Sequence, residues 1–375
     1  MEENYEIKIQ NKTLIIWRVI SIFLLVSLIT IVILYALGIG WKDKDKDKDK
    51  KENTSDSILS LWKEDSEPRK KLVDYVNTIT SKSNSEYIPP ESRIAVFDFD
   101  GTLFSETDPT YFECLLFSHR VLNDPIYKEI ASAQDKITAQ ELIDTNVHDF
   151  PSELEMRYVS ALPKIFKDMT YEDFDEYIQE YMKLPSVRFT NKNRAQGFYE
   201  PMVQVVEYLQ ANNFIVYIVT GSDRFIVRSV AKTRLTIPNR RIIGTISNVV
   251  ASGQNNIDGL NYEYQDNDEL ILGGNFILEN VKMNKVSLIQ TEIGTKPVLC
   301  FGNSSGDYSM AKFVTTNNDY LSMAFMVCCD DLDREYGNME KANRVNEKCL
   351  NNNWVPISMK NDWKRIYAEG VEKKL

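Results

Sequence analysis

The chain has 375 residues, of which 43% are hydrophobic and 26% charged, a composition typical of globular proteins with one large domain or two smaller ones. Its net charge of −11 argues against nucleic-acid binding, because phosphate contacts need clustered Lys and Arg. The only histidines are His119 and His148, and no Cys-x-x-Cys pair occurs, so a zinc site of His and Cys is not expected.

The first 56 residues predict a membrane anchor followed by a spacer. The segment 19–38 carries no charge, and a helix of about 20 residues spans a bilayer. A cleavable signal has a shorter apolar region, although the small residues Ala36 and Gly38 leave cleavage open. We therefore expect an N-terminal tail over 1–18, a single transmembrane helix over 19–38 and a charged linker over 39–56, whose alternating Lys and Asp cannot form a core.

Beyond residue 56, apolar runs alternate with helical patterns. The stretch 67–80 places Leu72, Val76 and Ile79 on one face, which predicts an amphipathic helix. Strands are expected in the apolar runs at 93–99, 214–220, 241–246, 297–302 and 320–327. Strands that alternate with helices predict a parallel sheet covered on both faces.

Two insertions interrupt this alternation. Residues 104–199 show helical patterns without clear strands, and the segment that starts with Thr170 carries a helix-capping pattern, with Pro185 limiting the helix. Residues 259–274 are expected to form a hairpin. Among the cysteines, Cys329 and Cys349 are expected either to pair, if the domain is exported, or to remain free thiols.

The first chemical motif follows the first strand. Asp98 and Asp100 lie one residue apart at its carboxyl end, which is the edge of a parallel sheet where ligands bind. Two such carboxylates can share a metal, and one can act as a nucleophile while the other transfers protons. Gly101 then allows the chain to turn sharply.

A second motif, Thr220-Gly221-Ser222, follows the strand at 214–219. A hydroxyl and free backbone N–H groups near a helix start suit a phosphate oxygen, although polar residues after a strand are common. Taken alone, Lys285 on an amphipathic helix would be a solvated side chain, and Lys282 lies close enough to compete for the same role.

A fourth element, Gly302-Asn303-Ser304-Ser305-Gly306-Asp307, follows the strand at 297–302. Asn303 and Asp307 supply hard oxygen atoms there. Oxygen ligands without His or Cys favour Mg²⁺.

Together and in this order, the four elements resemble the haloacid dehalogenase superfamily of phosphohydrolases over about residues 60–370. "DFDGT" (98–102) is similar to the first motif of that family, and "VTGS" (219–222), Lys285 and "GNSSGD" (302–307) fit the other three. The region around the first motif is similar to a bacterial branch near the phosphoserine-phosphatase-like members. The resemblance implies an α/β fold, with a Rossmann-like three-layer core over 57–103 and 200–375 and a helical cap over 104–199.

The resemblance also implies roles for individual residues. Asp98 would attack phosphorus, Asp100 would act as acid and then base, and Lys285 would offset charge between Asp98 and the phosphoryl group. Thr220, with Gly221 and Ser222, would bind phosphoryl oxygens. The implied Mg²⁺ ligands are Asp98, the Asp100 backbone carbonyl, Asn303 and Asp307, and Glu106 is a candidate contact for a cationic substrate group.

One residue departs from the family pattern, because the fourth motif usually begins Gly-Asp and here reads Gly302-Asn303. An amide oxygen still ligates Mg²⁺, but one negative charge is lost, so the site is either a subfamily variant or weakened. The alternative for Glu106 is that it is a helix-start carboxylate that interacts with a helix dipole and does not contact the substrate. Arg120 and Arg157 are further candidate anion contacts on the cap.

We therefore expect a Mg²⁺-dependent phosphomonoesterase that acts on a small phosphate ester and binds no nucleic acid. The alternatives are a phosphotransferase that uses the same aspartyl-phosphate and a membrane-tethered binding module that has lost activity. The lysines around 19–38 favour a cytoplasmic C-terminal side. Members of the branch that this chain resembles commonly carry export signals, so we expect a single-pass membrane protein with an extracytoplasmic catalytic domain.

Overall fold

The computed structural model describes residues 57–145 and 147–374. The tail, the transmembrane helix and the linker predicted over 1–18, 19–38 and 39–56 lie outside these residues. Within the described part of the chain, no helix is both long and apolar enough to cross a bilayer.

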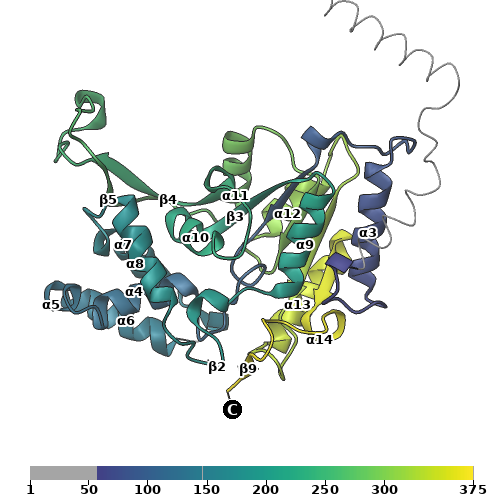
Figure 1. The fold of residues 1–375 in the computed structure, drawn as a ribbon, viewed down its shortest axis with the longest axis horizontal. Helices are drawn as coiled ribbons and strands as arrows, with labels where there is room; N and C mark the ends of the chain where they lie inside the picture. Colours follow the sequence, from purple (N-terminus) through teal and green to yellow (C-terminus); the bar gives the residue numbers. More distant parts are fainter. Residues whose placement is uncertain (1–56, 146, 375) are drawn as a thin grey trace, which may run out of the picture. The chain divides into compact units, whose positions relative to one another are not determined.

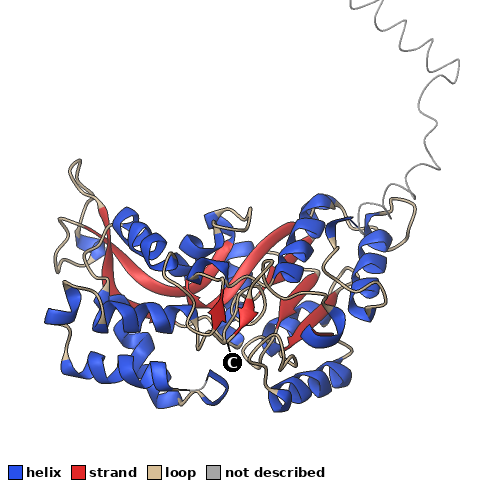
Figure 2. Ribbon diagram, turned by 60° about the horizontal axis from the view of Figure 1, so that its bottom comes forward, coloured by secondary structure: helices blue, strands red, loops and turns tan. Residues whose placement is uncertain are grey.

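A seven-stranded sheet forms the centre of the fold, in the order β5-β4-β3-β1-β6-β7-β8. Every neighbouring pair is parallel except the antiparallel pair β4 and β5 (Figure 2). The predicted mostly parallel α/β sheet is thus confirmed. The strands are β1 (Ile94–Phe97), β3 (Ile215–Asp223), β4 (Ile242–Ala251), β5 (Leu270–Leu278), β6 (Leu299–Gly302), β7 (Met323–Cys328) and β8 (Val355–Ser358).

Helices cover both faces of the sheet, because successive side chains of each strand point to opposite sides. Phe97 of β1 belongs to one buried cluster, and its neighbour Val96 belongs to the other. The first cluster includes α3 (Glu67–Thr80), α9 (Glu200–Ala211) and α10 (Arg224–Ala231). The second includes α11 (Met283–Leu288), α12 (Tyr308–Thr315) and α13 (Met339–Asn352). This gives the three-layer arrangement expected from the alternating sequence.

Aromatic side chains reinforce the middle of the sheet. The ring of Phe301 stacks on Phe97 at 4.2 Å between centroids and on Phe325 at 5.1 Å. These three residues come from the neighbouring strands β1, β6 and β7, and all are almost fully buried. Burying one such side chain contributes about 1.5–3 kcal/mol, so this row fixes the strand that carries the paired aspartates.

A helical insert lies between β1 and β3. Figure 1 shows its helices gathered to one side of the sheet beside β4 and β5, and α7 and α8 contact β5. The helices are α4 (Phe112–Leu122), α5 (Tyr127–Ile130), α6 (Ala133–Asp144), α7 (Ser152–Ile165) and α8 (Tyr171–Met182). The predicted start of α8 is confirmed, because the Thr170 hydroxyl oxygen accepts a hydrogen bond from the Asp173 N–H at 3.0 Å.

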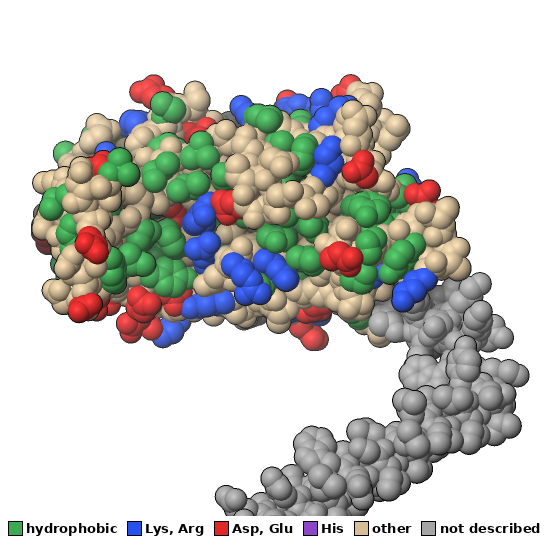
Figure 3. Space-filling view, turned by 90° about the horizontal axis from the view of Figure 1, so that it is seen from above, with side chains coloured by type: hydrophobic (Ala, Val, Ile, Leu, Met, Phe, Trp, Pro, Cys, Tyr) green, Lys and Arg blue, Asp and Glu red, His purple; other side chains and the backbone are tan. Residues whose placement is uncertain are grey.

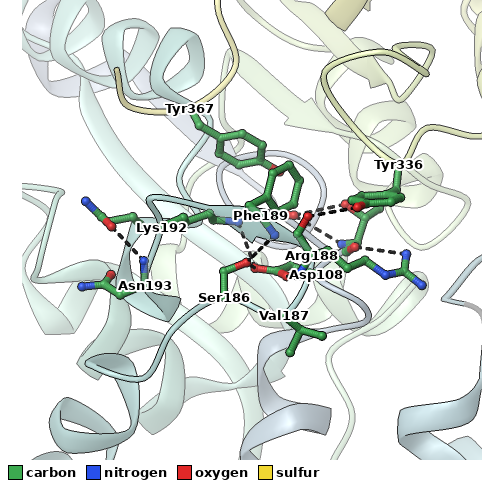
Figure 4. A network of polar contacts seen from close by, with 12 residues as sticks. Asp108, Ser186, Val187, Arg188, Phe189, Lys192, Asn193, Tyr336 and Tyr367 are labelled. Atoms are coloured by element: carbon green, nitrogen blue, oxygen red, sulfur yellow. Dashed lines mark hydrogen bonds and ion pairs between the residues drawn. The ribbon is translucent and has the colours of Figure 1, made fainter. Parts of the chain in front are cut away.

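Both links between the insert and the sheet meet at one buried network (Figure 4). Asp108 on the first link accepts hydrogen bonds from the Ser186 hydroxyl at 2.5 Å and the Lys192 ammonium at 3.1 Å, both on the second link. The Lys192 ammonium also lies over the rings of Phe189 and Tyr367, 4.2 and 4.3 Å from their centroids. The second link adds a two-stranded sheet of β2 (Phe189–Thr190) and β9 (Glu372–Lys373).

The seven-stranded sheet differs from the sequence expectation at both of its edges. The hairpin expected over 259–274 is formed instead by β4 and β5, so β4 continues to Ala251, beyond the predicted end at 246. The edge strand β8 was not expected, since its four residues include Pro356 and proline weakens a strand pattern.

The remaining elements are short. Helix α14 is Met359–Asp362 and α11 continues as a π-helical turn, Ile289–Ile293; 3₁₀ turns lie at Pro90–Ser92, Val147–Asp149, Arg194–Gln196, Asn239–Arg241 and Gly259–Asn261. The five cysteines are all buried and free. Cys329 and Cys349 belong to different clusters, on opposite faces of the sheet, so the free-thiol alternative holds.

Candidate active site

The motifs that follow three different strands meet in one cavity of about 140 Å³. Because β1, β3 and β6 are parallel neighbours, their carboxyl ends lie at the same edge of the sheet. Eight of the nine predicted site residues line this cavity: Asp98, Asp100, Glu106, Gly221, Ser222, Lys285, Asn303 and Asp307.

The remaining predicted residue, Thr220, lies next to the cavity rather than in its lining. Its side chain is fully buried, and its hydroxyl oxygen accepts a hydrogen bond from the Ser222 N–H at 3.0 Å. Its carbonyl oxygen accepts another from the Asn280 amide at 3.0 Å. The end of β3 is therefore held in a fixed conformation, with Gly221 and Ser222 facing the cavity.

The backbone around Asp98 sets the direction of its side chain. Its N–H donates to the Phe301 carbonyl at 2.9 Å, which continues the pairing of β1 with β6 beyond the last strand residue. Two residues later, Gly101 has φ of +77°. A Cβ added to it would lie 1.8 Å from Asn303 Nδ2, so only glycine allows the first and fourth motifs to approach this closely.

Lys285 connects the first motif to the fourth. Its ammonium donates to Asp98 Oδ1 at 2.6 Å and to Asp307 Oδ1 at 2.7 Å, and its side chain is 2% exposed. Burial alone would lower the pKa of Lys285, but the Asp307 and Asp98 carboxylates outweigh burial and hold it above the ordinary value. Lys282, the competing candidate, is exposed, so Lys285 is the lysine that reaches the site.

The two aspartates of the first motif have different surroundings. Burial, together with the nearby Asp307 carboxylate, raises the pKa of Asp98 to about 7, although Lys285 acts in the opposite direction. Burial also raises the pKa of Asp100 well above its ordinary value, against a hydrogen bond of 2.7 Å that its Oδ2 accepts from the Ser222 hydroxyl. Asp98 thus has a permanent cationic partner, whereas Asp100 has only a hydroxyl and is suited to hold a proton.

Asp307 organises the loop after β6. Its Oδ2 accepts hydrogen bonds from the N–H groups of Asn303 at 2.9 Å and Ser304 at 3.1 Å, while Oδ1 accepts from Lys285. Both carboxylate oxygens are therefore engaged within the protein. The Asn303 side chain remains directed at the turn of the first motif, beside Gly101.

The oxygen atoms around this turn match the ligand preference of Mg²⁺. Asp98, Asp100 and Asn303 line the same cavity, and carboxylate, amide and carbonyl oxygens are the donors that Mg²⁺ takes, usually with several waters. Within residues 57–145 and 147–374, no three Asp, Glu, His or Cys side chains form a cluster able to hold an ion. A magnesium ion here would thus depend on the Asn303 amide, the Asp100 carbonyl and water as well as on Asp98.

Several residues at the site were missed by sequence reasoning. The Lys341 ammonium on α13 donates to Glu106 Oε1 at 2.5 Å, and Glu106 itself is 1% exposed. The Glu106 partner lies 235 positions away, so no local pattern signals it. The insert and the segment after β5 add further lining residues that no motif covered: Tyr111, Glu113, Cys114, Phe150, Glu155, Tyr158, Val159, Glu279 and Val281.

Comparison with known families gives one match. A family model described as haloacid dehalogenase-like hydrolase matches residues 95–312, which include all nine predicted site residues. None of the curated proteins compared with the chain matches it in sequence.

Several solved structures are similar to the chain at low sequence identity. A conserved functionally unknown protein from Anaerococcus prevotii DSM 20548 has 14% identity and a TM-score of 0.48, over 78% of this chain and 91% of that one. Cytosolic 5'-nucleotidase IIIB bound to cytidine has 13% identity and a TM-score of 0.44, over 78% and 86%. A phosphoserine phosphohydrolase-like protein from Francisella tularensis subsp. tularensis SCHU S4 has 17% identity and a TM-score of 0.37, over 68% of this chain and 92% of that one. We draw no functional conclusion from likenesses at this level.

Proposed function

This chain belongs to the haloacid dehalogenase-like hydrolase family, and we propose that it is a Mg²⁺-dependent phosphomonoesterase that forms an aspartyl-phosphate on Asp98. The observation that carries the proposal is the pairing of two unlike aspartates in one buried cavity. Asp98 is held by the Lys285 ammonium at 2.6 Å, and Asp100 is held by the Ser222 hydroxyl and has a raised pKa. Phosphoryl transfer depends mainly on such positioning and charge neutralisation.

The first step is an attack of an Asp98 carboxylate oxygen on phosphorus. The bond between phosphorus and the ester oxygen breaks, and protonated Asp100 gives its proton to the departing alkoxide, which leaves as the alcohol. The Lys285 ammonium lies beside Asp98 and offsets the charge that accumulates there. Gly221 and Ser222 line the cavity and would contact the phosphoryl oxygens. Thr220 is buried beside them and holds this turn, because its hydroxyl oxygen accepts the Ser222 N–H.

The second step regenerates the enzyme. Asp100, now ionised, takes a proton from a water molecule whose oxygen attacks the aspartyl-phosphate, so that inorganic phosphate leaves and the Asp98 carboxylate is restored. Asp98, the Asp100 backbone carbonyl and Asn303 would hold Mg²⁺, with Asp307 orienting the loop and adding negative charge. When bound, the ion neutralises charge on the phosphoryl group.

The direct test is phosphate release from p-nitrophenyl phosphate by the full chain, with Mg²⁺ and with a chelator. We expect release that requires Mg²⁺ and is abolished in Asp98→Asn. A matched control is Asp74→Asn, the same chemical change at an exposed position of α3, which should leave the rate unchanged. Release that persists in Asp98→Asn would refute the aspartyl-phosphate mechanism, and transfer of phosphate to an added alcohol in place of water would identify a phosphotransferase.

We further propose that residues 19–38 anchor the protein in a membrane and that residues 57–375 act on its extracytoplasmic side. The support is the uncharged stretch of the sequence, which is long enough to span a bilayer. Membrane fractionation followed by protease treatment of intact cells tests both statements. Digestion of the catalytic part only after lysis would place it in the cytoplasm instead.

A further inference from the structure

The cavity extends from the paired aspartates to a wall that the proposed reaction does not use. This wall is built by α4, by α7 and by the segment between β5 and α11. It contributes three carboxylates, Glu113, Glu155 and Glu279, and several aromatic side chains. The wall and the paired aspartates line one cavity, so the leaving group of a bound phosphate ester would meet the wall.

The charges around the cavity do not balance. Seven carboxylates line it, whereas Lys285 is the one lysine or arginine among the described lining residues. Lys285 compensates Asp98 and Asp307, and Lys341 compensates Glu106 from outside the lining. Within the part of the chain that the structure describes, no lysine or arginine forms an ion pair with any of the three carboxylates of the wall.

Glu113 is positioned by the protein rather than by a counter-ion. One of its carboxylate oxygens, Oε2, accepts a hydrogen bond from the Asp223 N–H at 2.9 Å, at the end of β3. The Tyr158 hydroxyl lies beside the same carboxyl group and, like the Asp223 N–H, acts to lower its pKa. Burial raises the pKa of Glu113 to about 7, and burial followed by the proximity of Glu155 raises the pKa of Glu279, so a cation placed among them would be stabilised.

A buried tyrosine gives an independent sign of a missing ligand. Tyr158 on α7 lines the cavity and is 3% exposed, yet its hydroxyl has no hydrogen-bond partner of regular geometry. It lies beside Glu113 and Cys114. Its contact with the Glu113 carboxyl falls short of a regular hydrogen bond, so the hydroxyl can also meet a polar group that enters the cavity.

Aromatic rings complete the wall. The rings of Tyr111 and Phe150 lie 6.0 Å apart between centroids, and both line the cavity. Aromatic faces attract cations, and carboxylates accept hydrogen bonds from ammonium groups. Rings and unpaired carboxylates together therefore favour an organic cation over a neutral group.

Among the described residues that line the cavity, Lys285 is the one lysine or arginine, and it already pairs with Asp98 and Asp307. The two cap arginines that were candidate anion contacts are engaged elsewhere, Arg120 with Asp124 at 2.8 Å and Arg157 with Glu141. The cations Lys282, Lys341, Arg344 and Lys348 line an adjoining outer groove of about 790 Å³, whose lining also includes Glu155 and Glu279. On the molecular face of Figure 3, acidic side chains are scattered, so the concentration in the cavity is a local feature.

We propose that the leaving group of the substrate carries an ammonium and no carboxylate, so that the substrate is the phosphate monoester of a small amino alcohol. Its cationic end lies among Glu113, Glu155 and Glu279. This inference rests on the proposed phosphatase function. Contact with a cationic group of the substrate, first considered for Glu106, is assigned to the three wall carboxylates, because Glu106 already forms an ion pair with Lys341. A cavity of about 150 Å³ holds a benzene molecule, and the phosphoryl group takes part of the 140 Å³ here, so the remaining space suits a leaving group of only a few heavy atoms.

The test compares three esters of similar size with the purified full chain and Mg²⁺. Phosphoethanolamine carries the ammonium, propyl phosphate lacks it, and phosphoserine adds a carboxylate. We expect kcat/KM for phosphoethanolamine to exceed that of each of the other two by about 10- to 100-fold, the range for charge-assisted hydrogen bonds. Equal values for the three esters, or a preference for phosphoserine, would overturn the inference.

Isosteric variants assign the preference to the wall. Glu113→Gln and Glu155→Gln should each lower the ratio of kcat/KM for phosphoethanolamine over propyl phosphate by about tenfold. Glu153→Gln is the matched control, since Glu153 lies on α7 two residues before Glu155 and is exposed as Glu155 is, but does not line the cavity. An unchanged ratio in both wall variants would refute the assignment. Loss of a second Mg²⁺-binding step in Glu113→Gln would show that a metal ion, not an ammonium, occupies the wall.

A binding measurement separates this inference from the proposed reaction. Calorimetry with 2-aminoethylphosphonate and propylphosphonate, which cannot be hydrolysed as esters, should give at least a tenfold lower Kd for the amino compound. If p-nitrophenyl phosphate is hydrolysed but the two phosphonates bind equally, the proposed phosphatase function is supported and the proposed ammonium site is refuted. If no ester is hydrolysed but the amino compound binds more tightly, the ammonium site is supported and the proposed phosphatase reaction is refuted.

Discussion

The buried pair of Glu106 and Lys341 joins the turn after the paired aspartates to helix α13, and its removal tests how the site is held. The Glu106 side chain is 2% exposed, whereas that of Lys341 is 17% exposed. Lys341→Met leaves a carboxylate buried without its cation, which costs about 3–5 kcal/mol of the free energy of unfolding. Glu106→Gln leaves a neutral amide and a lysine that can reach water, so a smaller loss of about 1–3 kcal/mol is expected.

The double variant distinguishes an interaction from two separate losses. Glu106→Gln combined with Lys341→Met contains neither charge, so it should be more stable than the sum of the single losses predicts, by about 1–3 kcal/mol. Urea-induced unfolding, followed by tryptophan fluorescence, measures all four proteins. Arg344→Met is the matched control on the same helix, because its ion pair with Glu340 is exposed and should contribute at most about 0.5 kcal/mol. Single losses that add to within about 0.5 kcal/mol would refute the reasoning.

Three further predictions concern other parts of the molecule. Gly101→Ala places a Cβ 1.8 Å from Asn303 Nδ2, at a φ of +77°. The rate of p-nitrophenyl phosphate hydrolysis should therefore fall at least tenfold. A wild-type rate would show that the first and fourth motifs can move apart. Asp108→Asn removes the carboxylate that pairs with the buried Lys192 ammonium. The free energy of unfolding should fall by about 3 kcal/mol, and calorimetry should show a lower Tm. An unchanged Tm would contradict this. Burial raises the pKa of Glu113 to about 7, so the folded state binds more protons than the unfolded state between about pH 4.5 and pH 7, and this stabilisation is lost as pH rises. Urea unfolding should therefore show Glu113→Gln gaining about 3 kcal/mol relative to wild type from pH 4.5 to pH 7, and a constant difference would mean that Glu113 titrates normally.

Much of the catalytic arrangement was predictable because it depends on local patterns. Each motif follows an apolar run, and in a parallel sheet the ends of such runs share one edge, so order and spacing along the chain were sufficient to place Asp98, Gly221 and Asn303 together. The helix at 67–80 and the cap at Thr170 were likewise fixed by periodicity and by a side chain that satisfies free N–H groups. The family match over residues 95–312 agrees with this reading.

The sequence did not by itself decide which polar residues around the motifs are free to act. Lys282 and Lys285 are three positions apart, and only burial of the second against two aspartates separates them. Glu106 is neutralised by Lys341 from a helix more than two hundred positions later, whereas Glu113, Glu155 and Glu279 line one cavity and form no ion pair with the described lysines and arginines. Local patterns determine where strands and helices begin and end. The packing of the insert against the sheet determines which charges are compensated, because contacts between distant segments leave no periodic signal in the chain.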